Sequence, residues 1–202
     1  MKAMKQQILE RIERLGPGTV FTAKDFLDIS SRGTADVTLS TLVREGAIRR
    51  LQRGLYDSPK ENPALGGTLS PDIDQSARAL ARRYRWNIVP DGAWAANLLG
   101  LSTQVPAKIV YLSDGPNQVV PIGRRTIHFK HARPQTLPSG PGIAALVIQA
   151  LRYLGKEHVN ESVILRLRDI LSQADRRRLI GATRFGVDWI YETAKQMAKE
   201  SH

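Results

Sequence analysis

Apolar residues recur at helical spacing in the N-terminal part of the chain. A first helix is predicted before Gly16-Pro17-Gly18, on the apolar positions Met4, Ile8, Ile12 and Leu15. Residues 19–21 are long enough only for a single β-bridge. Thr22, followed by Asp25, is typical of an N-cap with an acidic residue in the first turn, so a second, short helix is expected after it.

A third apolar stripe follows the predicted turn at residues 30–33. It predicts a helix whose inward positions are Ala35, Leu39, Leu42 and Val43. Residues 48–51 and 54–56 then read as two short strands, with Gly54 free to adopt a positive φ. The order helix, bridge, helix, turn, helix and hairpin predicts a winged helix-turn-helix domain over residues 1–60.

The remainder of the chain has mixed periodicity. Residues 61–69 are rich in Pro and Gly and are predicted to be a linker. Residues 70–202 are predicted to form a mixed α+β domain that ends in a helical region, so the fold class is α+β. The expected helices are 72–84, 91–99, 143–154, 161–171, 173–182 and 187–199, and the expected strands are 86–89, 108–112, 118–122 and 126–130.

The helix predicted after residue 33 is expected to enter the major groove of duplex DNA, because the second helix of a helix-turn-helix does so. Candidate DNA contacts on its outward face, ahead of it and on the hairpin are Thr34, Val37, Thr38, Thr41, Arg44, Arg32, Arg49, Arg50 and Arg53. Three other interpretations stay open. Val37 packs against a neighbouring helix, the hairpin arginines form a solvated strand edge, or the winged helix binds a protein.

The charge balance also favours a nucleic-acid partner. The chain carries a net charge of +11, with 30 Lys and Arg against 19 Asp and Glu. Residues 1–60 account for +4 and residues 61–202 for +7. Further basic clusters therefore lie in the second part of the chain, at Arg82-Arg83-Arg85, Arg124-Arg125 and Arg176-Arg177-Arg178.

Other features of the composition bear on compartment and chemistry. The absence of cysteine excludes disulfides and thiolate metal sites and favours the cytoplasm, and no apolar run is long enough to span a membrane. His128 and His131 lie three apart in a predicted strand and so point to opposite faces. No metal-ligand spacing, phosphate-binding loop or nucleophile elbow is present. We therefore expect a protein that is not an enzyme and binds no metal or cofactor.

Several segments resemble AbiEi-type antitoxins of type IV, abortive-infection toxin–antitoxin systems. The resemblance rests on Arg32-Gly33, on residues 39–48, and on Arg53-Gly54-Leu55-Tyr56. It continues through the Gly-Leu-Ser-Thr-Gln-Val-Pro segment at 100–106, through residues 111–115 and through residues 150–156. The chain departs from the family at Thr41, where such proteins often carry a basic residue.

The resemblance implies a DNA-binding antitoxin that represses its own operon by binding inverted repeats in the promoter. A monomer that binds the repeats cooperatively is compatible with it. The functional partner it implies is a nucleotidyltransferase-like toxin, which the antitoxin need not bind directly. The alternative from a different class is a protein- or RNA-interaction module that neutralises a partner by direct binding.

Overall fold

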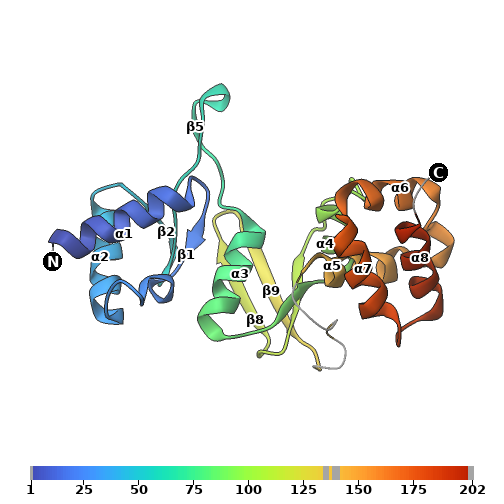
Figure 1. The fold of residues 1–202 in the computed structure, drawn as a ribbon. Helices are drawn as coiled ribbons and strands as arrows, with labels where there is room; N and C mark the ends of the chain where they lie inside the picture. The colour runs from blue at the N-terminus through green and yellow to red at the C-terminus, as the bar shows by residue number, and fades with distance from the viewer. Residues whose placement is uncertain (1, 134–136, 138–141, 200–202) are drawn as a thin grey trace. The chain divides into compact units, whose positions relative to one another are not determined.

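The structure is a computed structural model that describes residues 2–133, 137 and 142–199. Its helices and strands form a mixed α+β fold, as the sequence predicts (Figure 1). Contacts between residues divide the chain into two compact units. The first comprises Met1–Trp86 with Val119–Ile127, and the second comprises Asn87–Gln118 with His128–His202.

The N-terminal part of the first unit has the predicted order of elements. These are α1 (Lys2–Leu15), β1 (Val20–Phe21), the 3-10 helix η1 (Ala23–Phe26), α2 (Arg32–Arg44), β2 (Arg49–Gln52) and β3 (Leu55–Asp57). The three strands form an antiparallel sheet in the order β1-β3-β2. The expected bridge at residues 19–21 is therefore a short strand that pairs with the hairpin.

The second of the three predicted helices is a single 3-10 turn. It begins at Thr22, whose backbone N donates a hydrogen bond of 2.8 Å to Oδ2 of Asp25. The Thr22 hydroxyl donates to the same oxygen over 3.0 Å. These two bonds satisfy the helix start locally, so four residues are enough to place Phe26 in the core.

A hydrophobic core joins α1, η1 and α2. Ile8 and Ile12 of α1 are buried against Leu39 and Leu42 of α2, together with aromatic and small residues from η1 and the sheet. Phe21 and Phe26 meet edge to face, with ring centroids 5.5 Å apart. This core holds α2 against α1, η1 and the sheet that contains β2 and β3.

The linker predicted over residues 61–69 is wrong. These residues form a two-stranded hairpin, β4 (Glu61–Asn62) and β5 (Gly67–Thr68), around the 3-10 helix η2 (Pro63–Leu65). Asn62 caps η2 by accepting a hydrogen bond of 3.1 Å from Ala64 N. Gly66 closes the turn with a positive φ of 63°. The hairpin extends away from β1 and β2 (Figure 1).

The division into units also differs from the predicted boundary before residue 70. Helix α3 (Ile73–Tyr84) belongs to the first unit, because polar contacts hold it to the N-terminal segment. Arg82 Nε donates to Asp25 Oδ1 over 3.0 Å, and Gln75 Oε1 accepts from Val20 N over 3.3 Å. Such partners lie more than fifty residues apart in the sequence, which is why periodicity did not show them.

The sequence placed the remaining α-helices and strands to within two residues. They are β6 (Ile88–Pro90), α4 (Gly92–Leu98), β7 (Ile109–Ser113), β8 (Gln118–Ile122), β9 (Arg125–His131), α5 (Ile143–Leu154), α6 (Glu161–Ile170), α7 (Gln173–Thr183) and α8 (Asp188–Ala198). A 3-10 turn at Lys156–His158, which the sequence did not predict, follows α5. A four-stranded sheet has the order β6-β7-β9-β8.

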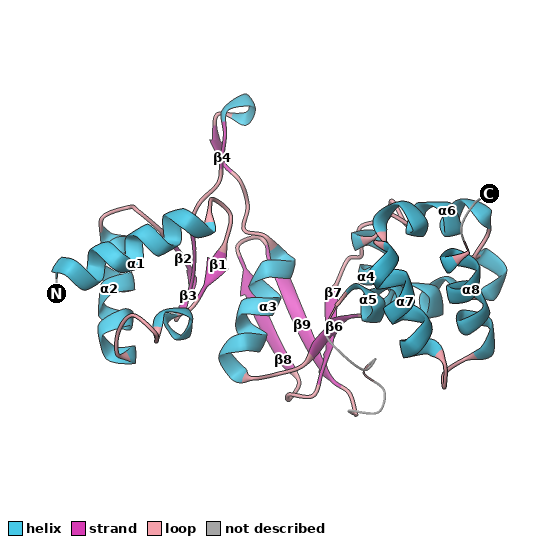
Figure 2. Ribbon diagram, viewed as in Figure 1, coloured by secondary structure: helices cyan, strands magenta, loops and turns pink. Residues whose placement is uncertain are grey.

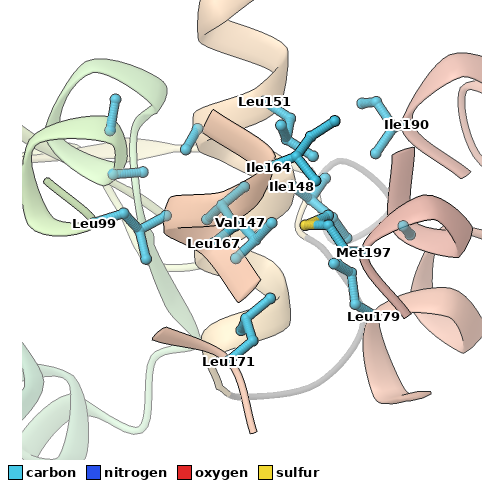
Figure 3. Close-up of a cluster of buried hydrophobic side chains, with 14 residues drawn as sticks. Leu99, Val147, Ile148, Leu151, Ile164, Leu167, Leu171, Leu179, Ile190 and Met197 are labelled. Carbon is cyan, nitrogen blue, oxygen red and sulfur yellow. The ribbon is translucent and has the colours of Figure 1, made fainter. Parts of the chain in front are cut away.

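Helices α4 to α8 gather at the C-terminal end of the second unit (Figure 2). Their buried side chains form one cluster, to which Leu99, Val147, Leu167 and Met197 belong (Figure 3). This cluster is the core on which the predicted helical region depends. No helix in the described part of the chain is both long and apolar enough to cross a membrane.

Candidate nucleic-acid interface

Helix α2 carries most of the predicted DNA contacts. Ser31 caps its N-terminus, with Oγ accepting a hydrogen bond of 3.3 Å from Thr34 N. Arg32, Val37 and Arg44 are exposed as predicted, and 60% of Val37 is accessible. The interpretation that Val37 packs against a neighbouring helix therefore does not hold within the described structure. Thr34 is half-buried beside its cap.

The prediction that Thr38 faces outward is wrong. Thr38 is only 8% exposed. It lies three residues after Ala35 and four before Leu42, so it belongs to the same inward stripe as these two apolar residues. Thr38 was expected on the outer face because its side chain is polar, but its position along α2 places it on the buried face. We remove Thr38 from the candidate contacts.

The hydroxyl of Thr41 is already engaged within α2. Its Oγ1 donates a hydrogen bond of 3.0 Å to the carbonyl of Val37 and accepts one of 3.2 Å from Arg44 Nη2. The donor of Thr41 is thus used inside the helix. Arg44 is exposed, and its other guanidinium hydrogens remain directed away from Thr41.

Arg49 is part of the fold rather than of the interface, which corrects its assignment as a DNA contact. Its guanidinium donates from Nε and Nη2 to the two carboxylate oxygens of Asp57, over 3.0 and 2.6 Å. It also donates to the carbonyl of Leu69 over 3.2 Å. The hydrogen bonds that Arg49 donates to Asp57 raise the pKa of the Arg49 guanidinium. Because Asp57 is 1% exposed, this pair neutralises a buried carboxylate.

Arg50 and Arg53 remain exposed on the hairpin, as predicted. Arg50 donates to Ser40 Oγ over 3.1 Å, and its guanidinium carbon lies 5.5 Å from the centre of the Tyr56 ring. These contacts orient Arg50 along α2 while leaving its charge without a carboxylate partner in the described structure. Arg53 lies at the hairpin turn, next to Gly54.

A groove of about 930 Å³ lies between η1, the N-terminal half of α2 and the hairpin, all within the first unit. Five cationic side chains line it, against the single carboxylate of Asp36: Lys24, Arg32, Arg50, Arg53 and Arg83. Asp36 is 3.7 Å from Arg32 in an exposed pair. A smaller hollow of about 430 Å³ adjoins it along α2 and includes Val37 and Arg44. We call the larger one the basic groove.

Two of these cations are absent from the predicted set. Lys24 precedes the predicted interface, and Arg83 comes from α3, beyond the predicted domain boundary. Lys24 Nζ donates to the carbonyl of Arg83 over 2.6 Å, and Arg83 Nη1 donates to the carbonyl of Arg53 over 2.8 Å. The basic cluster at 82–85 was the only sequence signal for Arg83, and nothing in the sequence connected it to the hairpin.

The other basic clusters divide between structural and exposed roles. Arg82 pairs with Asp25, and Arg176 Nε donates to the carbonyl of Leu171 over 3.2 Å. Arg124, Arg125 and Arg177 are exposed. Within residues 2–133, 137 and 142–199, no group of three or more metal-ligating side chains is placed to hold an ion.

Comparisons with known proteins give a family and similar solved structures. The sequence profile of DUF6088, described as a family of unknown function, matches residues 7–179. No curated protein matches the chain. The crystal structure of the RV2827C protein from Mycobacterium tuberculosis is similar at 17% identity and a TM-score of 0.44, over 97% of this chain and 76% of that one.

Proposed function

The chain belongs to DUF6088, a family of unknown function, and we propose that it binds double-stranded DNA through the basic groove. One observation carries the proposal: five cations from η1, α2, the hairpin and α3 line one groove that contains a single carboxylate. Clustered Lys and Arg side chains neutralise phosphates and release counterions, and this supplies most of the affinity of DNA-binding proteins.

The arrangement of α2 and the hairpin supports a winged helix-turn-helix mode of binding. In that mode α2 enters the major groove and the hairpin lies along the backbone. Val37 and Arg44 would face base edges, since both are exposed on the outer side of α2. Arg32, Arg50 and Arg53 would contact phosphates. Val37 would pack against a thymine methyl group.

The biological role follows from the resemblance to AbiEi-type antitoxins. We propose that the protein is a cytoplasmic antitoxin that represses its own operon and opposes a nucleotidyltransferase-like toxin. It acts as a binding protein in this proposal, not as an enzyme. The expected partner is the DNA of its own promoter. The toxin is a functional partner, which the protein need not bind directly.

Fluorescence anisotropy with duplex DNA from upstream of the gene tests the DNA-binding proposal. We expect tighter binding to this DNA than to a shuffled duplex of equal composition at physiological salt. Replacing Arg50 and Arg53 by Gln should reduce the slope of log K against log salt by about 0.9 per lost phosphate contact. Arg14→Gln on α1 removes one positive charge outside the groove and is the matched control for each of the single groove variants.

Two results would overturn the proposal. One is equal affinity for the upstream and shuffled duplexes in the wild type. The other is a salt slope that changes as much in Arg14→Gln as in the groove variants, because binding would then follow total charge rather than the groove. Co-expression with the neighbouring toxin separately tests the antitoxin role, with rescue of growth expected.

A further inference from the structure

A second surface with both aromatic and basic side chains lies where α7 meets α8, at one end of the helical part of the second unit (Figure 1). Phe185 in this connection is 94% exposed, and the guanidinium carbon of Arg184 lies 5.5 Å from the centre of its ring. A phenyl ring this exposed contributes nothing to the buried core.

Cations line the helix that leads to this ring. Arg177 and Arg184 are seven residues apart, so they lie on one face of α7 about 10 Å apart along its axis. Gly181 lies between them on that face and is exposed, so no side chain at that position covers the arginines. Arg178 is 76% exposed and pairs with Asp175 over 3.2 Å, so it is partly neutralised.

The chemistry of this surface distinguishes between two kinds of partner. Phe and Arg occur in protein–protein interfaces as well, but the centre of such an interface holds contiguous apolar side chains. Here the ring stands between Arg184 and Gly186, and the nearest exposed apolar residue along the chain is Val187. Single strands of nucleic acid, by contrast, are bound by exposed aromatic rings set among cations that follow the phosphate backbone.

We propose that this surface binds single-stranded nucleic acid. An unpaired base stacks on the face of Phe185 that Arg184 does not cover, and Arg177 and Arg184 contact the phosphates on either side of it. The proposal concerns unpaired bases and is independent of duplex binding by the basic groove. It gives the second unit a binding activity of its own.

The test uses the full chain carrying Arg32→Gln, Arg50→Gln and Arg53→Gln, so that the basic groove loses three of its five cations. Anisotropy is measured with labelled 16-nucleotide strands of RNA and of DNA. Phe185→Ala should weaken binding about 5- to 150-fold, the effect of losing one stacked base. Phe185→Trp should preserve it, and Leu165→Ala, which truncates another half-exposed apolar residue on α6, should change nothing.

Salt dependence provides a second readout. Arg177→Gln combined with Arg184→Gln should lower the slope of log K against log salt by about 1.4, or 0.7 for each contact. Equal affinity for the two strands supports recognition by stacking and phosphate alone, and tighter binding of RNA adds a contact to the 2′-hydroxyl. The proposal is overturned if Phe185→Ala binds both strands within twofold of its parent. It is also overturned if poly-glutamate binds as tightly and with the same dependence on Phe185.

Discussion

Arg49 and Asp57 face each other across strands β2 and β3 and share two hydrogen bonds, of 3.0 and 2.6 Å. The carboxylate is buried while the guanidinium is about one-third exposed. Two parallel bonds of this kind fix the geometry of both side chains. The pair therefore holds the base of the hairpin, and the exposed Arg50 and Arg53 lie nearer its turn.

Arg49→Ala should lower the free energy of unfolding by about 3 kcal/mol, because it leaves the buried carboxylate of Asp57 without its cation. Chemical denaturation in urea measures this loss. Arg53→Ala is the matched control and should unfold within about 0.5 kcal/mol of the wild type. If both variants lose the same stability, the Arg49–Asp57 pair has no special structural role.

Gly54→Ala tests the close approach of α3 to the hairpin turn. Gly54 has a φ of +75°, and a Cβ there would lie 2.8 Å from Arg83 Nη1. Gly46 has the same φ with open space around it, so Gly46→Ala reports the backbone strain alone, about 1–2 kcal/mol. Gly54→Ala should lose about 1 kcal/mol more, from the displaced Arg83–Arg53 hydrogen bond.

A double-mutant cycle separates the two contributions at Gly54. In an Arg83→Ala background the extra loss should disappear, and Gly54→Ala should then equal Gly46→Ala. An extra loss that persists without Arg83 would show that the guanidinium is not what the new methyl group meets.

Gly92→Ala should destabilise the second unit by about 1–3 kcal/mol. A Cβ at Gly92 would lie 2.4 Å from Cβ of Tyr153 and 2.9 Å from the carbonyl oxygen of Gln149, so α4 would have to move away from α5. Gly181→Ala in α7 meets no atom within 4 Å and should raise stability by up to about 1 kcal/mol. Thermal unfolding of the two variants measures the contrast, and equal effects would contradict it.

Asp91→Asn should alter the pH dependence of stability. Asp91 caps α4 by accepting from Trp94 N over 3.1 Å, and burial raises the pKa of its carboxyl despite that bond. Because the folded pKa is the higher one, the stability from this group is fully present below the unfolded pKa and is lost as pH rises through the folded pKa. Asn caps equally well and carries no charge.

The wild type should therefore gain stability over Asp91→Asn as pH falls from 7 towards 4. Urea denaturation of both proteins across this range gives the difference. A difference that stays constant with pH, or that changes in the opposite direction, would show that burial of the Asp91 carboxylate is not the dominant influence on it.

The long amphipathic helices could be predicted because their apolar stripes repeat locally. Residues 143–154, for example, form α5 with the predicted bounds. The hairpin at 61–68 was missed because strands of two residues are too short to show alternation. Thr38 was misplaced because its hydroxyl suggested a surface position that its helical spacing contradicts.

The candidate site was partly predictable for the same reason. Arg32, Arg50 and Arg53 are exposed around the basic groove, and their local sequence shows a turn and a hairpin. The pairing of Arg49 with Asp57 depends on strand register. The position of Arg83 beside the hairpin turn depends on how α3 packs. Neither contact leaves a periodic trace in the sequence, because strand register sets the first and the packing of α3 sets the second.

The anchoring of α3 bears on how such proteins can evolve. Arg82 pairs with Asp25, and Arg83 reaches the hairpin turn, so the first sixty residues hold polar groups whose partners are encoded downstream. A recombination event that joined those sixty residues to another gene would remove the cationic partner of Asp25 and the side-chain donor to the Arg53 carbonyl. Inheritance should therefore keep residues 1–86 together, and exchange between relatives should be rare within that span.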